Sequence, residues 1–455
     1  MDYNLFELEK RYEIKLDSTQ KDVLSNLIDF VESEDQTICL KAPAGCGKSL
    51  ILSMLYDILI DNDISCAFVA PTNKAKLVLT NKGDESRCSL TIHSLLNLRP
   101  NIEIMDFDAA QLSFEFNVKK STVKWYDVLL IDECSMINDD LYNVLCSKFW
   151  NRKIVFCGDE SQLAPVKQRN KSKSFDTKVL SLTKIYRQPE SKLYKVLEYL
   201  RHKPLYHFQN VSDDNGNIIV CNNILEMIDQ YSYLFKVSED FRDHNLVKMI
   251  TYTNNRINAL NQVIRKKLYP EEAEYHLREI LTGYDTCNYY DILIENSKDY
   301  VVTYVNPTTF TYNNIKLLAY DLLLDDGNCK SQVKILSKNN PQWLLDALAI
   351  YLEDMRQKAV QSKKSSDWRI FFKLYNSFLT PVDLIYDGRV IKRKSLDYGY
   401  CISAHKSQSS SYSIVMIDME NIWRCTNDEE LRQLQYVACS RTTSDLIIYQ
   451  KDGNI

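Results

Sequence analysis

Glycine and proline are scarce in this sequence, with 10 of each among 455 residues. Long flexible linkers are rich in such residues, so we expect compact domains without them. The longest apolar runs are only as long as a strand, which indicates that no segment spans a membrane. The first residues lack the basic and then apolar stretch of a signal peptide, and we therefore expect a cytoplasmic protein.

Cysteine patterns of the kind that bind metals are also missing. The 13 cysteines form no Cys-x-x-Cys pair and no cluster with histidine at metal-ligand spacing. We predict reduced and mostly buried thiols, with neither disulfides nor a zinc site. The net charge of −5 excludes a protein coated in positive charge, although a locally basic groove can still bind nucleic acid.

Short apolar segments alternate with helical stretches in two parts of the chain. Strand candidates of the first part lie at 37–40, 66–69, 128–131 and 153–157. Those of the second part lie at 247–252, 400–402, 414–417 and 446–449. This alternation predicts an α/β fold with parallel sheets, in which ligands bind beyond the carboxyl ends of the strands.

An insertion at about 281–397 interrupts the second part. Strand-like runs are predicted within it at 300–305, 315–319 and 332–336. They precede an amphipathic helix predicted at 342–362.

A phosphate-binding motif follows the first strand candidate and opens a helix. The motif reads Ala42-Pro43-Ala44-Gly45-Cys46-Gly47-Lys48-Ser49. The backbone N–H groups of such a loop surround phosphate oxygens, and the helix amino terminus adds a favourable field. Lys48 is predicted to reach the β- and γ-phosphates of ATP, and the Ser49 hydroxyl to hold Mg²⁺. Ala42 stands where the usual pattern has its first glycine.

Two further strand candidates end in residues that suit nucleotide hydrolysis. The strand at 128–131 is followed by Asp132 and Glu133. Asp132 is predicted to hold Mg²⁺ through water, and Glu133 to polarise the attacking water. The strand at 153–157 leads into a Gly-Asp-x-x-Gln segment that ends at Gln162, whose amide is predicted to sense the γ-phosphate.

With these motifs the sequence resembles superfamily 1 helicases, most closely the Dda helicases of phages within the RecD/Dda-like branch. The residues that separate this branch from the UvrD/Rep branch are Asp132-Glu133-Cys134-Ser135-Met136 and Gln162-Leu163-Ala164-Pro165. The resemblance runs from Gln20 to Arg441. It implies two RecA-like P-loop lobes with parallel sheets, ATP and Mg²⁺ as cofactors, and 5′→3′ translocation on single-stranded DNA with duplex unwinding. It also implies a bacterial or phage-infected cytoplasm, and a setting in DNA replication, recombination or repair.

The resemblance assigns further residues to the nucleotide. Gln20 matches the glutamine that reads adenine upstream of the phosphate loop. Arg187, which follows Leu182-Thr183-Lys184-Ile185-Tyr186, and Arg441, at the end of Tyr436-Val437-Ala438-Cys439-Ser440-Arg441, match two arginine fingers. Because the arginines approach from across the cleft, hydrolysis would require the lobes to close.

The resemblance also assigns residues to DNA. The matching positions are Pro71, Thr72, Asn73 and His93 in the first lobe, and Asn254, His405 and Lys406 in the second. Ser409 stands where the family usually has glycine, which is expected to stiffen a DNA-facing turn.

Alternating apolar residues around 100–118 predict a β-hairpin. In the Dda-like family an insertion at this place forms the pin that splits the fork, with Phe114 or Phe116 expected to meet the DNA. The resemblance implies four units: a first lobe (1–98 and 125–190), the pin (99–124), a second lobe (191–280 and 398–455), and an SH3-like insertion with a helical extension (281–397).

The expected partners are single-stranded DNA and duplex forks, with single-strand-binding or replication proteins as further candidates, no membrane, and a monomeric chain. Two alternatives stay open: a 5′→3′ RNA helicase, and an ATP-driven nucleic-acid-binding remodeller that does not unwind. A small-molecule kinase would explain the phosphate loop, but it would not explain the second lobe or Arg187.

Overall fold

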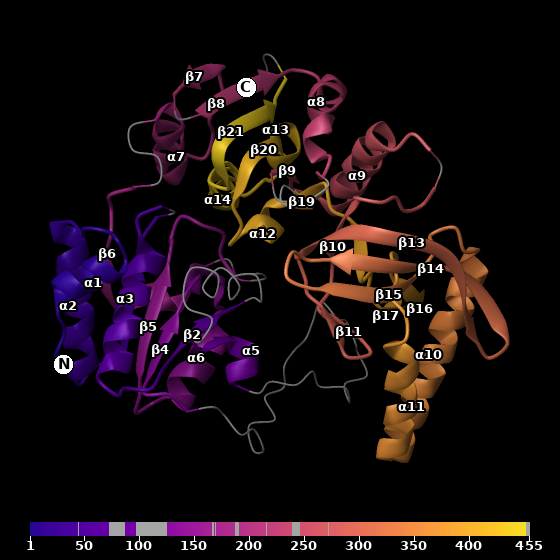
Figure 1. The fold of residues 1–455 in the computed structure, drawn as a ribbon, viewed down its shortest axis with the longest axis horizontal. Helices are drawn as coiled ribbons and strands as arrows, with labels where there is room; N and C mark the ends of the chain where they lie inside the picture. Colours follow the sequence, from indigo (N-terminus) through magenta and orange to yellow (C-terminus); the bar gives the residue numbers. More distant parts are fainter. Residues whose placement is uncertain are drawn as a thin grey trace.

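The computed structural model describes residues 1–43, 45–71, 87–96, 125–165, 168, 170–186, 191–214, 216–238, 246–271 and 273–451. Two α/β lobes stack one above the other, and a third body lies beside them (Figure 1). No helix among the described residues is both long enough and apolar enough to cross a bilayer.

The first lobe is built on a six-stranded sheet whose pairs are all parallel. Its order is β3-β2-β4-β5-β1-β6. The strands are β1 (Thr37–Lys41), β2 (Cys66–Ala70), β3 (Ser89–Thr91), β4 (Val128–Ile131), β5 (Lys153–Gly158) and β6 (Lys178–Ser181). The helices are α1 (Leu5–Arg11), α2 (Ser18–Glu32), α3 (Lys48–Asp61), α5 (Ile92–Leu95) and α6 (Asp139–Lys148), with 3-10 turns η1 (Cys134–Met136) and η2 (Lys173–Asp176).

Successive side chains of the first sheet enter two different cores. Ile38 and Leu40 of β1 pack with α2 and α3 on one face, whereas Cys39 packs with α5 and α6 on the other. Burial on both faces explains why these strands read as continuous apolar runs, as in other parallel sheets.

The second lobe repeats this plan. Its sheet has the order β19-β9-β20-β21-β8-β7, parallel except for the β7–β8 pair. The strands are β7 (Val211–Asp213), β8 (Gly216–Cys221), β9 (Val247–Thr251), β19 (Cys401–Ser403), β20 (Tyr412–Asp418) and β21 (Thr442–Tyr449). The helices are α7 (Lys192–His202), α8 (Ile224–Tyr231), η3 (Ser232–Phe235), α9 (Asn254–Leu268), α12 (Ala404–Ser407), α13 (Met419–Ile422) and α14 (Asp428–Cys439).

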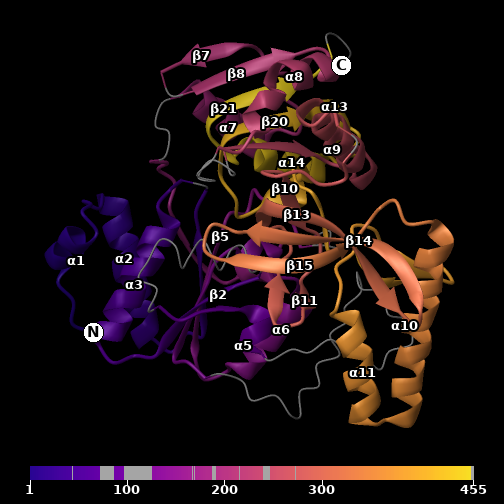
Figure 2. The same cartoon turned by 45° about the vertical axis from the view of Figure 1, so that its right-hand side comes forward.

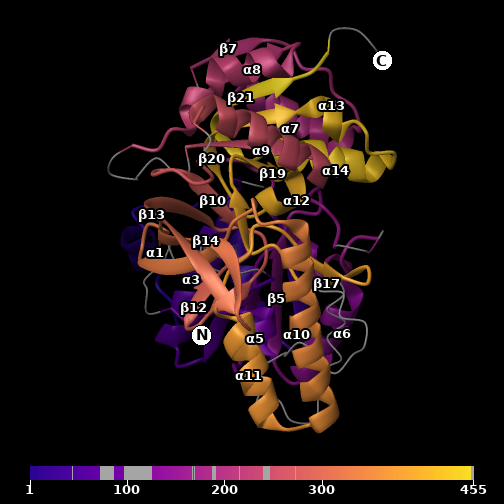
Figure 3. The same cartoon turned by 90° about the vertical axis from the view of Figure 1, so that its right-hand side faces the viewer.

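The third body is the insertion between α9 and β19. Its antiparallel sheet has the order β15-β14-β13-β10-β18. The strands are β10 (Ile280–Gly283), β13 (Asp299–Tyr312), β14 (Ile315–Asp325), β15 (Lys330–Leu336) and β18 (Leu396–Tyr398), with small pairs β11 (Cys287–Tyr289)–β12 (Ile292–Ile294) and β16 (Leu384–Tyr386)–β17 (Arg389–Lys392). The helices α10 (Gln342–Ser362) and α11 (Ser365–Tyr375) run side by side away from this sheet (Figures 2 and 3).

The insertion and the second lobe share one hydrophobic core, which contains Met249 of β9 together with Val301 of β13. A buried ion pair strengthens the join: Lys248 Nζ lies 2.7 Å from Asp299 Oδ2. The insertion is therefore fixed to the second lobe. Its description as SH3-like and the exact unit boundaries stay predictions.

Candidate functional site

The phosphate loop joins β1 to α3 through backbone that favours glycine. Gly45 has φ +88° and Gly47 has φ +83°. A Cβ at Gly47 would stand 2.9 Å from Nε2 of Gln20. Gly47 caps α3 without a side-chain hydrogen bond, so no side chain at the cap competes with an anion for the first amides of the helix. Ala44 lies outside the described residues.

Lys48 begins α3 and meets the carboxylates that follow β4. Its Nζ lies 3.6 Å from Asp132 Oδ1 and 3.6 Å from Glu133 Oε1. Burial by itself would lower the pKa of Lys48, but the two carboxylates outweigh burial and raise this pKa well above its ordinary value. Burial raises the pKa of Asp132, and the charge of Lys48 opposes that rise. The structure thus brings three of the predicted residues into one buried charge cluster.

The backbone beside this cluster is tightly constrained. Glu133 adopts φ +55°, a left-handed conformation that is uncommon for glutamate and is concentrated at functional sites. Gly158 closes β5 so near to η1 that a Cβ would stand 2.8 Å from Cys134 Sγ. The carboxyl ends of β4 and β5 are therefore packed against each other, and this packing fixes where Glu133 and the loop to Gln162 begin.

Several polar atoms near the predicted motifs are buried without a hydrogen-bond partner. Among the described residues they include Glu133 Oε2, Gln162 Oε1, Gln408 Nε2 and Ser409 Oγ. Buried polar groups are ordinarily paired, and exceptions often mark functional sites. Ser409 also has φ +61°. Its backbone therefore adopts the left-handed conformation that suits the glycine usually found at this position in the family, although its side chain is serine.

Gln20 lies against the phosphate loop, but its amide already has a structural role. Asp17 and Gln20 form a capping box at the start of α2: Gln20 N–H donates to Asp17 Oδ1 at 2.8 Å, and Asp17 N–H donates to Gln20 Oε1 at 3.2 Å. The Tyr186 hydroxyl donates to the other oxygen of Asp17. Adenine recognition by Gln20 stays a prediction. The Asp-x-x-Gln spacing is the signal in the sequence that indicates this capping box.

Of the two predicted arginine fingers, Arg187 lies outside the described residues. Arg441 follows α14 and is 4% exposed. Its Nε donates to Val437 O at 3.0 Å, its Nη2 to Ser440 Oγ at 2.7 Å, and its Nη1 to Ser410 O at 3.4 Å. The guanidinium is thus held by its own lobe, and its role at the nucleotide stays a prediction.

Two hydrogen bonds that the sequence did not predict join the lobes among the described residues. The hydroxyl of Tyr436 in α14 donates to Asp159 Oδ2 at 2.6 Å. The backbone N–H of Ala164 donates to Gln433 Oε1 at 3.3 Å. The Gly-Asp and Tyr-x-x-x-x-Arg motifs that contain Asp159 and Tyr436 were recognised, but nothing in the sequence paired these two residues.

The predicted DNA residues fall at corresponding edges of the two sheets. In the first lobe β2 and β3 are parallel neighbours, so Pro71 and the start of α5 follow at the same edge. In the second lobe β9 and β19 are parallel neighbours, so Asn254, at the start of α9, and His405 share an edge.

Local contacts hold the second-lobe DNA residues. His405 stacks on Tyr252, with ring centroids 6.4 Å apart, and burial lowers the pKa of His405. Lys406 Nζ lies 4.0 Å from the ring centroid of Tyr284 in the insertion. Some predicted DNA residues lie outside the described part of the chain: Thr72, Asn73, Phe114, Phe116 and the side chain of His93. The predicted pin hairpin lies outside it as well.

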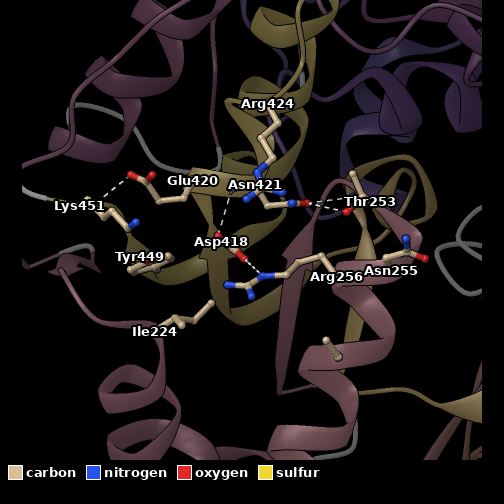
Figure 4. Close-up of a pocket in the computed structure, with 11 residues that line it drawn as sticks. Ile224, Thr253, Asn255, Arg256, Asp418, Glu420, Asn421, Arg424, Tyr449 and Lys451 are labelled. Carbon is tan, nitrogen blue, oxygen red and sulfur yellow. Dashed lines mark hydrogen bonds and ion pairs between the residues drawn. The ribbon is translucent and has the colours of Figure 1, made fainter. Parts of the chain in front are cut away.

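A cavity of about 530 Å³ lies at the carboxyl ends of β9, β20 and β21 (Figure 4). Arg256 crosses it to Asp418, with Nε 2.6 Å from Oδ2. Three basic and two acidic side chains line this cavity, so its charges nearly balance and select no class of ligand. None of the residues predicted to bind ATP or DNA lines it.

Comparison with known proteins agrees with the geometry. The sequence pattern of the family described as AAA domain matches residues 15–222. The chain is 23% identical to the ATP-dependent DNA helicase dda of Enterobacteria phage T4, over 58% of this chain and 59% of the relative. It is 22% identical to the RecD subunit of the RecBCD enzyme of Buchnera aphidicola (subsp. Schizaphis graminum), over 95% of this chain and 73% of the relative.

These similarities support a superfamily 1 helicase of the RecD and Dda type. The chain shares its fold with the Pif1 helicase of Candida albicans, at a TM-score of 0.50 and 18% identity, covering 97% of this chain and 96% of that one. That likeness supports two RecA-like lobes with parallel sheets, the fold class predicted from the sequence.

Proposed function

We propose that this superfamily 1 helicase hydrolyses ATP with Mg²⁺, moves 5′→3′ on single-stranded DNA and unwinds duplex DNA. The observation that carries the proposal is the buried cluster of Lys48, Asp132 and Glu133 at the carboxyl ends of β1 and β4. A cation at a helix amino terminus binds phosphate, and a carboxylate without a full set of partners can accept a proton from water.

The residues present fit a magnesium ion. Asp132 supplies a buried carboxylate, Ser49 follows Lys48 in the first turn of α3, and hard oxygen donors are the ligands that Mg²⁺ prefers. When bound with nucleotide, the ion would neutralise phosphate charge. Lys48 would neutralise the same phosphates, and Glu133 would orient the attacking water and take its proton through the unpartnered Oε2.

The DNA path is proposed to cross the β2–β3 edge of the first lobe and the β9–β19 edge of the second. Opening and closing of the lobes during the ATP cycle would then change the distance between these two DNA-contacting edges. That change of distance is the physical basis of the proposed translocation. The relative named as an ATP-dependent DNA helicase supports DNA as the substrate. The proposed 5′→3′ direction rests on the RecD/Dda-like form of the motifs at Asp132 and Gln162. We further propose that the chain works as a monomer in a bacterial or phage-infected cytoplasm.

The test is the steady-state ATPase rate without nucleic acid, with single-stranded DNA and with single-stranded RNA of the same length. The proposal expects a rate that requires Mg²⁺ and rises strongly with DNA. A rise with RNA alone would favour the RNA helicase, and a rate that nucleic acid does not change would contradict a motor.

A further inference from the structure

One hydrogen bond joins the two lobes in a place that water does not reach. Tyr436 lies on α14, which faces the first lobe (Figure 1), and Asp159 follows β5 of that lobe. The hydroxyl oxygen and the Asp159 carboxylate oxygen are 2.6 Å apart, and each residue is only 2% exposed. A hydrogen bond to a charged group is stronger than one between neutral groups, and burial protects it from competition by water.

The bond keeps one direction over the physiological pH range. Burial raises the pKa of Tyr436 well above its ordinary value, and the charge of Asp159 raises it further. The positive charges of Arg201 and Arg441 oppose this rise only in part. Tyr436 therefore remains the donor and Asp159 the acceptor.

On the first lobe, Asp159 controls the loop that presents Gln162. Its Oδ1 accepts the N–H of Ser161 at 3.0 Å, and its backbone carbonyl accepts the N–H of Gln162 at 3.1 Å. Two residues further on, Ala164 N–H reaches Gln433 of the same helix α14. α14 is thus joined by two hydrogen bonds to the loop that carries the predicted γ-phosphate sensor.

On the second lobe, Tyr436 belongs to the helix end that holds Arg441. Ser440 N–H donates to the carbonyl of Tyr436 at 2.9 Å, and Arg441 Nε donates to the carbonyl of Val437. A single helical turn therefore links the hydroxyl of Tyr436 to the guanidinium of Arg441. The bond connects the two halves of the predicted catalytic apparatus.

We propose that the Tyr436–Asp159 hydrogen bond is an interlobe latch, and that both are positioning residues that set Gln162 and Arg441 at the distance which ATP hydrolysis needs. The inference rests on the proposed ATP-driven function. It adds that closure depends on a direct bond between protein groups as well as on the nucleotide. The latch should govern turnover and lobe closure, whereas nucleotide affinity depends on the phosphate loop.

The experiment compares Tyr436→Phe, Asp159→Asn and the double variant with the wild type. DNA-stimulated kcat, nucleotide Kd and ATP-analogue-dependent closure, read by energy transfer between a dye on each lobe, are measured for each. Tyr436→Phe should lower kcat about tenfold or more, as expected for one hydrogen bond to a charged group, with Kd changed less than about threefold and closure reduced. Because both residues act through one bond, the double variant should lose less than the product of the single losses.

The matched control is Tyr398→Phe. Tyr398 is 3% exposed, and its hydroxyl donates to the Glu274 carbonyl at 2.9 Å. Neither residue belongs to the first lobe, so the control loses a buried tyrosine hydrogen bond that does not join the lobes. Normal kcat and closure in Tyr436→Phe would overturn the latch, and so would losses equal to those of Tyr398→Phe or multiplicative losses in the double variant. Failure of the wild type itself to hydrolyse ATP would overturn the proposed function instead.

Discussion

Replacing Lys48 with alanine removes the cation that pairs with two buried carboxylates. Asp132 and Glu133 each have an oxygen 3.6 Å from Nζ, and the three side chains are 12%, 7% and 9% exposed. Removal of one partner from a buried ion pair costs about 3–5 kcal/mol, because the remaining charge is left uncompensated. We expect Lys48→Ala to abolish ATPase activity and to lower the free energy of unfolding by about 3 kcal/mol at pH 8.

The loss of stability should be smaller at low pH. Burial raises the pKa of Asp132 in the folded protein, and without Lys48 this pKa should rise further. A carboxyl group whose pKa is raised by folding binds more protons in the folded state, so its penalty grows as pH rises through the folded pKa. The unfolding free energy of Lys48→Ala should therefore approach that of the wild type as pH is lowered from 8 toward the folded pKa of Asp132.

The assay is urea unfolding of both proteins at a series of pH values from 8 downward, beside the ATPase rate. Lys41→Ala is the matched control, since Lys41 lies on β1 and pairs with Glu160 at 2.9 Å, but the two side chains are 28% and 35% exposed. A partly exposed pair contributes at most about 1 kcal/mol. Wild-type stability of Lys48→Ala throughout this pH series, or retained hydrolysis, would refute the electrostatic reasoning.

Other substitutions test separate parts of the account. Glu133→Gln should bind ATP but slow hydrolysis by about 10²-fold or more, as single-turnover kinetics would measure; normal turnover would remove Glu133 from the chemistry. Arg441→Ala should lower kcat much more than nucleotide affinity, and the opposite pattern would reject an arginine finger. Ser409→Gly should raise the free energy of unfolding by about 1 kcal/mol, because serine at φ +61° carries left-handed strain; a loss of stability would contradict this. Alanine at Phe114 and Phe116 should reduce unwinding but spare DNA-stimulated ATPase, whereas equal losses in both would indicate a structural role.

The parallel strands and the long helix were predictable because their sequences carry strong local signals. The predicted range 128–131 matches β4, and the predicted range 342–362 matches α10. A strand buried on both faces must be apolar throughout, and an amphipathic helix shows its period over many residues. The same reasoning placed Asp132 and Glu133 together, since both follow one buried strand.

Other features depend on contacts that a linear sequence does not display. β6 (Lys178–Ser181) is largely exposed at the edge of the sheet and pairs with β1, more than 130 residues earlier, so its mixed composition gave no strand signal. The Tyr436–Asp159 bond joins residues 277 positions apart. The engagement of Arg441 with three groups of its own lobe likewise emerges only from packing.

The most direct test of the account is strand displacement on duplexes that carry a single-stranded tail at only the 5′ end or only the 3′ end. With ATP and Mg²⁺, the account predicts displacement of the 5′-tailed duplex by the wild type, little on the 3′-tailed duplex, and none of either by Lys48→Ala. Displacement that prefers the 3′ tail would contradict the proposed direction. Robust DNA-stimulated hydrolysis with no displacement of either substrate would contradict the proposed unwinding activity.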